Sequence, residues 1–91
     1  MKTTLARRRR RPIGTDDYLD FARRIITAAG DRVAAEDPEQ LRRLIDLRAD
    51  LDEAIIEAVR GLRNADITWE DIGRATGTTR QAAIMKWGPK L

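Results

Sequence analysis

Residues 68–87 read TWEDIGRATGTTRQAAIMKW, and this stretch decides the fold of the C-terminal part of the chain. Thr68 and Thr79 each predict a helix N-cap, because a threonine oxygen accepts a hydrogen bond from the free N–H groups of a first helical turn. Gly77 predicts the left-handed residue that ends the first helix. We therefore expect two short helices joined by a short turn, the second from about Arg80 to Trp87.

The spacing of small residues in this stretch fits two helices that cross closely. Gly73 is expected where the second helix approaches the first, since only a small residue fits there. Ala83 is expected to pack back against the first helix, and Trp87, one turn later, to anchor the contact. Thr76 and Thr78 offer little apolar surface, so the pair of helices should depend on a longer helix for stability.

Residues 72–83, IGRATGTTRQAA, resemble the helix-turn-helix of small bacterial and bacteriophage regulators, especially actinobacterial ones. They are also similar to the promoter-reading C-terminal domain of sigma factors. The resemblance covers about residues 66–88, and this chain departs from it by having Thr76 and Thr78 where Leu and Val are usual. It implies that the second helix lies in the major groove of double-stranded DNA, with its first turn facing base edges.

The resemblance places the DNA-facing residues on this second helix. Arg80 would pair with guanine and Gln81 with adenine, each contributing about 1–3 kcal/mol of discrimination. Ile84 would touch a thymine methyl group, and the lysines would reach phosphates, which positions a protein without reading sequence. The residues implied for DNA binding in this region are Thr79, Arg80, Gln81, Ile84, Met85, Lys86 and Lys90.

Charge is unevenly distributed along the 91 residues, whose net charge is +3. Residues 1–14 contain six basic and no acidic side chains, and we expect a disordered basic arm that lies along a DNA groove or backbone. Residues 15–66 hold 8 basic and 13 acidic side chains, whereas no acidic residue occurs from Gly77 onward. A solubilising tail is the alternative interpretation of the arm. Its arginines are Arg7, Arg8, Arg9, Arg10 and Arg11.

Residues 15–66 predict a helical support or dimerisation unit made of two longer helices. The first should have Thr15 as its N-cap, and its apolar positions recur at steps of three and four. Gly30 either ends this helix or leaves a weak point within it. The apolar positions of this helix are Leu19, Ala22, Ile25, Ile26, Ala29 and Val33.

The second longer helix should begin at Pro38, after Asp37 as N-cap, and close near Asn64. Arg48 lies within its apolar stripe, so the stripe cannot be wholly buried in the core of one monomer. The stripe is therefore either core or part of a homodimer interface, and the sequence leaves both open. The stripe consists of Leu41, Leu44, Ile45, Leu51, Ala54, Ile55, Ala58, Val59 and Leu62.

Composition excludes several classes of function. The chain has no Cys and no His, which excludes disulfide frameworks, zinc fingers, thiol nucleophiles and imidazole catalysis. Without a nucleophile–base pair, a phosphate loop or a metal triad, we expect no enzyme, no cofactor and no metal. No apolar stretch approaches the ~20 residues of a membrane span. Four carboxylates at helical spacing are interpreted as a solvated face: Asp46, Asp50, Glu53 and Glu57.

The sequence thus predicts an all-α protein of about four helices, with an arm (1–14), a support unit (15–66) and a helix-turn-helix (67–91). We expect a cytoplasmic, nucleoid-associated regulator of transcription that binds double-stranded DNA sequence-specifically as a homodimer. One alternative is a protein-interaction module that binds RNA polymerase or another regulator through Ile84, Met85 and the acidic middle. Another is a DNA-packaging scaffold. Core packing is expected for Trp69 and Trp87, in preference to base stacking.

Overall fold

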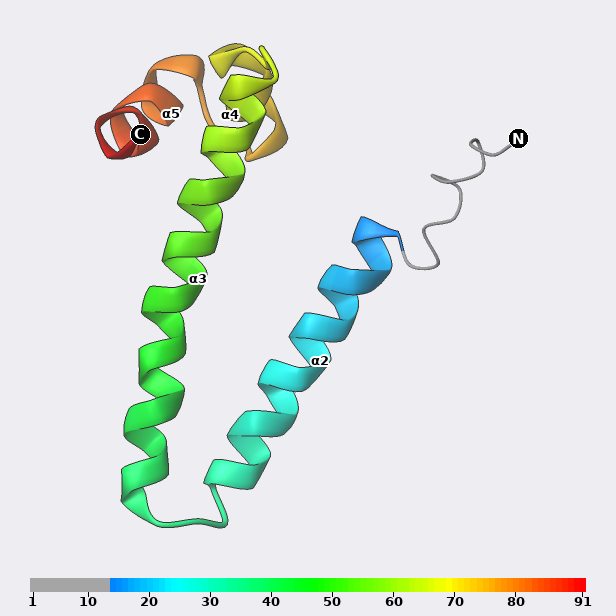
Figure 1. The fold of residues 1–91 in the computed structure, drawn as a ribbon, viewed down its shortest axis with the longest axis vertical. Helices are drawn as coiled ribbons and strands as arrows, with labels where there is room; N and C mark the ends of the chain where they lie inside the picture. The colour runs from blue at the N-terminus through cyan, green and yellow to red at the C-terminus, as the bar shows by residue number, and fades with distance from the viewer. Residues whose placement is uncertain (1–13) are drawn as a thin grey trace. The chain divides into compact units, whose positions relative to one another are not determined.

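The computed structural model describes residues 14–91, which contain four α-helices, one short 3₁₀ helix and no strand (Figure 1). The predicted all-α class with four helices is therefore confirmed for these residues. The predicted arm arginines, Arg7–Arg11, lie outside the described residues. The elements are α2 (Thr15–Val33), α3 (Pro38–Asn64), α4 (Trp69–Ala75), α5 (Arg80–Trp87) and the 3₁₀ helix η1 (Gly88–Lys90).

The chain divides into two compact units, and the division falls within α3, between Leu44 and Ile45. In the first unit, α2 begins one residue earlier than the cap prediction requires. Gly14, with extended backbone angles, occupies the N-cap position, and its carbonyl accepts the first helical hydrogen bond from the Tyr18 N–H at 3.0 Å. Thr15 is therefore the first helical residue, and its prediction as N-cap is wrong. The physical reason is that glycine tolerates the cap position almost as well as threonine.

The helix α2 is continuous through Gly30 and ends at Val33. Asp16 and Asp17 lie in its first turn, where negative charge interacts favourably with the helix dipole. No residue of α2 is buried. Its apolar stripe is therefore present as predicted and is not buried within the first unit.

The helix α3 begins at Pro38 and ends at Asn64, as the sequence predicts. Val59 is its only buried residue within the described chain. In the second unit, the large stripe side chains Leu51, Ile55 and Leu62 are exposed to 53%, 40% and 44%. Within the second unit, α4 and α5 cover only one side of α3, so its part of the stripe is not wholly the core of that unit, and the core interpretation of the whole stripe stays a prediction. The interface interpretation stays a prediction.

A tight turn connects α3 to α4. Asp66 adopts a left-handed backbone angle of φ 66°, and the Ile67 N–H donates to the Leu62 carbonyl at 3.0 Å. Aspartate tolerates this conformation better than most residues, because its short polar side chain can hydrogen-bond locally. The sequence pattern indicates Asn64 as the end of the helix but does not single out Asp66 as the residue that reverses the chain.

The core of the second unit is small and joins three helices. It consists of Val59 from α3, Ile72 from α4, and Ala83 and Trp87 from α5. Ala83 is fully buried, and Ile67 and Trp69 pack against the cluster as partly buried side chains. The predicted roles of Ala83, Trp87 and Trp69 in packing are confirmed. The dependence of the short helices on α3 for stability stays a prediction, which the place of Val59 in the core supports.

Replacing Val59 with Ala should destabilise the second unit. Val59 is 5% exposed and is the contribution of α3 to a core of four buried side chains, so losing two buried carbon atoms should cost about 2 kcal/mol. Urea unfolding followed by near-ultraviolet circular dichroism, which reports Trp69 and Trp87, measures this. Val33→Ala, at a half-buried position of α2, is the control and should leave the urea midpoint of this transition unchanged. Equal midpoints for the two variants would contradict the packing described here.

Candidate nucleic-acid interface

The relative position of α4 and α5 is fixed by a close backbone approach at Gly73. A Cβ atom at this position would lie 2.8 Å from the Thr79 carbonyl oxygen and 3.0 Å from that of Thr78. In the same place the Thr78 N–H donates to the Gly73 carbonyl at 2.7 Å. The obstructing atoms belong to the backbone and cannot rotate away. Gly73 is thus required by the crossing of the two helices, as its position in the sequence predicts.

The turn between the two helices contains Gly77 at φ 76°, the left-handed conformation that the sequence predicts. Thr76 ends α4, and its hydroxyl donates to the Ile72 carbonyl at 2.8 Å. A hydrogen bond to the end of the helix therefore takes the place of the apolar contact that a larger aliphatic residue at Thr76 would make.

Both predicted N-caps are present. The Thr68 hydroxyl accepts from the Asp71 N–H at 3.0 Å, and the Thr79 hydroxyl accepts from the Ala82 N–H at 3.0 Å. In each case the cap residue is extended and the helix begins at the following residue. The Thr79 hydroxyl oxygen accepts in this cap, so its proton can still donate to an acceptor such as a phosphate.

The outer face of α5 is the surface that the resemblance assigns to DNA. Ala83 and Trp87 face the core, whereas Arg80, Gln81 and Met85 are exposed, Met85 to 70%. The helical period places residues 81 and 85 away from the side that carries residues 83 and 87. Residue 80, three positions before 83, shares the side of 83 and is exposed because it begins the helix. Arg80 and Gln81 thus stand in the first turn, open to solvent.

Ile84 differs from the other predicted contact residues because it is half-buried. Its Cγ2 atom lies 3.6 Å from the point that a Cβ on Gly88 would occupy, so the side chain leans toward η1. Only part of its apolar surface is available for a thymine methyl group. Ile84 is therefore only partly exposed, less than the predicted outward-facing position implies.

Two lysines lie near the C-terminal end of α5. The Lys86 ammonium is 5.4 Å from the centroid of the Trp87 ring, and the Lys90 carbonyl accepts from Arg60 Nη2 at 3.2 Å. Both lysine side chains are exposed. Together with Ile55, Ile56, Asp52 and Trp87 they line an open hollow of about 300 Å³ between α3 and the end of α5.

The exposed surface of α5 is positively charged. Its first turn contains no acidic residue, and within residues 14–91 none of Arg80, Lys86 and Lys90 forms an ion pair. Arg74 on α4, by contrast, pairs with Asp71. Exposed cationic side chains of this kind are suited to contact a phosphate backbone, although Asp52 of α3 lines the same hollow as Lys86 and Lys90.

Two arginines of α3 attach the short helices to the long one, a role that the sequence-based expectations above do not include. Arg63 donates to the Ile67 carbonyl at 2.8 Å, and its guanidinium lies 5.1 Å from the centroid of the Trp69 ring. Arg60 pairs with Glu57 and donates to the Lys90 carbonyl. The signal available in the sequence was their position in the last turns of a helix, where basic side chains often reach nearby carbonyls.

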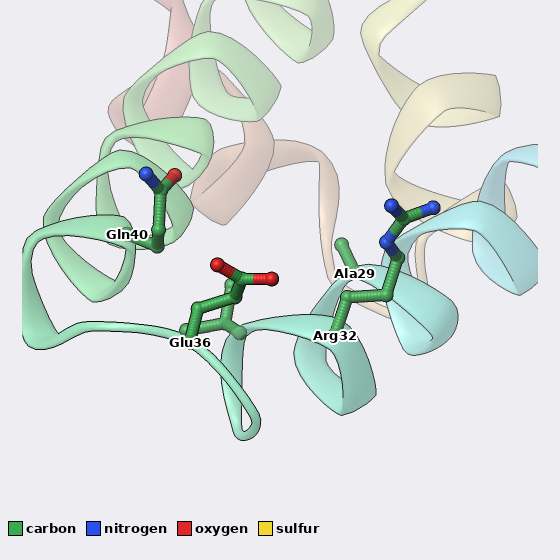
Figure 2. Close-up of a pocket in the computed structure, with 5 residues that line it drawn as sticks. Ala29, Arg32, Glu36 and Gln40 are labelled. Atoms are coloured by element: carbon green, nitrogen blue, oxygen red, sulfur yellow. The ribbon is translucent and has the colours of Figure 1, made fainter.

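The first unit contains a separate hollow of about 390 Å³ at the junction of α2 and α3. Figure 2 shows Arg32 from α2, Glu36 from the connecting segment and Gln40 from α3 around it, with Ala29 behind. Arg32, Glu36 and Gln40 are exposed, so this hollow is an open surface feature. Among the described residues no buried polar group points into it, and we assign no ligand to it.

Neither a membrane span nor a metal site is found in the part of the chain that the structure describes. No helix within residues 14–91 combines the length and apolar composition needed to cross a bilayer. No cluster of three or more acidic side chains in the same residues is placed to hold a metal ion. Comparisons with protein-family models, with curated proteins and with solved structures find no match to this chain.

The close approach at Gly73 predicts opposite effects for two glycine substitutions. Gly73→Ala should lower the free energy of unfolding by about 1–3 kcal/mol, because the new methyl group meets backbone atoms. Gly61→Ala should raise it by about 0.5–1 kcal/mol, since nothing lies within 4 Å of that position and alanine favours the helix. Thermal unfolding by circular dichroism compares the two. A neutral Gly73→Ala would show that the helices do not cross as described.

Proposed function

We propose that this protein is a sequence-specific double-stranded DNA-binding regulator of transcription, in which α4 and α5 act as a helix-turn-helix. The observation that carries the proposal is the division of α5 into two faces. Ala83 and Trp87 hold the helix on the core, while Arg80 and Gln81 are exposed in a first turn that contains no acidic residue. An isolated helix of this width fits the major groove, where base edges are distinguishable.

The chemistry of the exposed residues suits direct reading of bases. The planar guanidinium of Arg80 can donate two hydrogen bonds to guanine O6 and N7, and the amide of Gln81 can both donate to and accept from adenine. Met85, one turn further along the exposed face, offers an apolar surface for a thymine methyl group. Thr79, Lys86 and Lys90 are suited to phosphate oxygens, which fix the protein on the duplex without reading its sequence.

The arginine-rich segment, Arg7–Arg11, is proposed as a second contact with the DNA. Its support is the density of positive charge in residues 1–14, which carry no acidic side chain. Each phosphate that such an arm neutralises adds about 0.9 to the slope of log affinity against log salt. A homodimer would place two α5 helices about 34 Å apart, one turn of the duplex, on a pseudo-palindromic site.

Selection of bound sequences from a random duplex pool, followed by fluorescence-anisotropy titration, tests the reading role of α5. Arg80→Ala and Gln81→Ala should each flatten the preference at one base pair, a loss of about 1–3 kcal/mol of discrimination. Arg74→Ala is the matched control, because this exposed arginine on α4 pairs with Asp71, and its loss should leave the preference intact. If Arg80→Ala keeps the full preference, α5 does not read the bases.

The residues that bind phosphate without reading sequence should behave differently in the same titration. Lys86→Ala and deletion of residues 1–11 should weaken binding to all duplexes alike. Each should also reduce the salt dependence, by about 0.9 in slope for every phosphate that the protein no longer neutralises. A deletion that leaves the salt slope unchanged would show that the arm is only a solvated tail. A wild-type chain that ignores duplexes even at low salt would contradict the proposal as a whole.

A second candidate function is binding of a protein such as RNA polymerase or another regulator. The observation that favours it is Met85, which is 70% exposed in the same helix as the half-buried Ile84. Exposed apolar side chains on a short helix suit a protein partner as well as a thymine methyl group. A pull-down that survives nuclease treatment and is lost in Met85→Glu, while duplex binding is undetectable, would favour this function over DNA binding.

A further inference from the structure

The helix α3 carries apolar side chains on two adjacent sides in its C-terminal half, and only one of them is covered. Val59 is buried against α4 and α5, and Ile56 on the same side is half-buried. Leu51, Ile55 and Leu62, on the neighbouring side, are exposed to 53%, 40% and 44%. The second unit therefore leaves a continuous apolar strip along its longest helix.

The spacing along this strip is that of a coiled coil. We name as the α3 seam the residues Arg48, Leu51, Ile55, Ala58 and Leu62, which follow one another at steps of three, four, three and four. The same spacing continues backward through Leu44 to Leu41, so the pattern spans three heptads of one uninterrupted helix. A repeat of 3.5 residues keeps a seam turned toward one partner helix along its length.

We propose that the α3 seam pairs with the α3 seam of a second copy of this chain, with the two helices antiparallel. Arg48 sets the orientation. A parallel pair in register would place the two Arg48 side chains against each other, and like charges at a seam position are repulsive. An antiparallel pair with its two-fold axis at Glu53 places Arg48 opposite Ala58 of the second copy and Leu51 opposite Ile55 of that copy.

The antiparallel arrangement is also complementary in volume. The long Arg48 side chain faces the small Ala58 of the second copy, and Gly61, one turn from Ala58, leaves further room. The two Arg48 residues are separated by ten positions along the axis, about 15 Å, so they do not repel at close range.

The other occupant to consider is α2 of the same chain, which also carries an apolar stripe. Its 19 residues are joined to α3 by residues 34–37. Folded back along α3, they would end opposite about residue 56, because both helices rise by the same 1.5 Å per residue. Ala58 and Leu62 would stay uncovered, whereas a second copy covers the seam to Leu62.

This inference depends on the apolar side of α3 and does not require DNA binding. If the protein also binds DNA, the pairing sets the separation of its two DNA-binding ends, because the two Val59 residues would be about 18 Å apart along the paired helices. The short helices attached there would lie at opposite ends of the dimer. Two copies of α5 would then be presented by one rigid pair of helices.

Light scattering after size-exclusion chromatography of the full chain tests the pairing. We expect a mass of twice 10.3 kDa at 100 µM, falling to 10.3 kDa in Leu51→Glu and Ile55→Glu, with unchanged near-ultraviolet circular dichroism. Ala49→Glu adds the same charge on the other side of the helix and should stay a dimer. A monomeric wild type, with α2 or nothing on the seam, would overturn the proposal, as would charged variants that remain dimeric.

The absence of Cys from the sequence allows the orientation to be tested directly, because any disulfide must join introduced residues. Leu44→Cys and Leu62→Cys chains should cross-link when mixed and not alone, since the axis at Glu53 pairs position 44 with position 62 of the second copy. Cross-links within each single variant would show a parallel pair. In an Arg48→Leu background we expect this selectivity to be lost. A dimer that ignores DNA would contradict the proposed function and leave this inference standing.

Discussion

The close approach of Gly73 to the Thr79 backbone is the constraint on which the rest of the second unit depends. A Cβ atom on Gly73 would lie 2.8 Å from the Thr79 carbonyl oxygen, so no side chain fits there. The helix α5 therefore starts against α4 with a fixed direction. Gly77 and the Thr79 cap then complete the turn with conformations that few other residues adopt at no cost. From this start the helical period turns Ala83 and Trp87 inward and Gln81 and Met85 outward, while Arg80 is exposed as the first residue of the helix.

We expect the two short helices to be too small to be stable without α3. Their core contains four buried side chains, and one of them, Val59, belongs to α3. Arg63, stacked on Trp69 and bonded to the Ile67 carbonyl, holds the connecting turn at the same end of the long helix. The long helix thus serves as the platform for α4 and α5 and keeps an apolar strip open beside them. The long helix α3 thus holds α5 exposed at one end and carries, beside it, an apolar surface suited to self-association.

The sequence predicted local structure well where one residue decides the conformation. The bounds of α3, α4 and α5 follow from Pro38, Thr68, Gly77 and Thr79, whose backbone preferences or cap hydrogen bonds act within a few residues. Prediction failed where the outcome depends on contacts distant in sequence. Thr15 and Gly14 are both acceptable caps, periodicity cannot tell which parts of a stripe are covered, and the role of Arg63 depends on how the chain returns past it. Ile84 is half-buried because η1 continues the chain beyond α5.

The most direct measurement of the central claim is a nuclear magnetic resonance titration of the isotopically labelled chain with a random duplex at low salt. We predict that the amide signals of Arg80 and Gln81 and the side-chain amide of Gln81 shift first. The amide of Ala83 and the indole of Trp87, which face the core, should move little. Shifts concentrated on α2, or signals of α5 that do not respond to saturating duplex, would contradict the assignment of α5 as the helix that enters the groove.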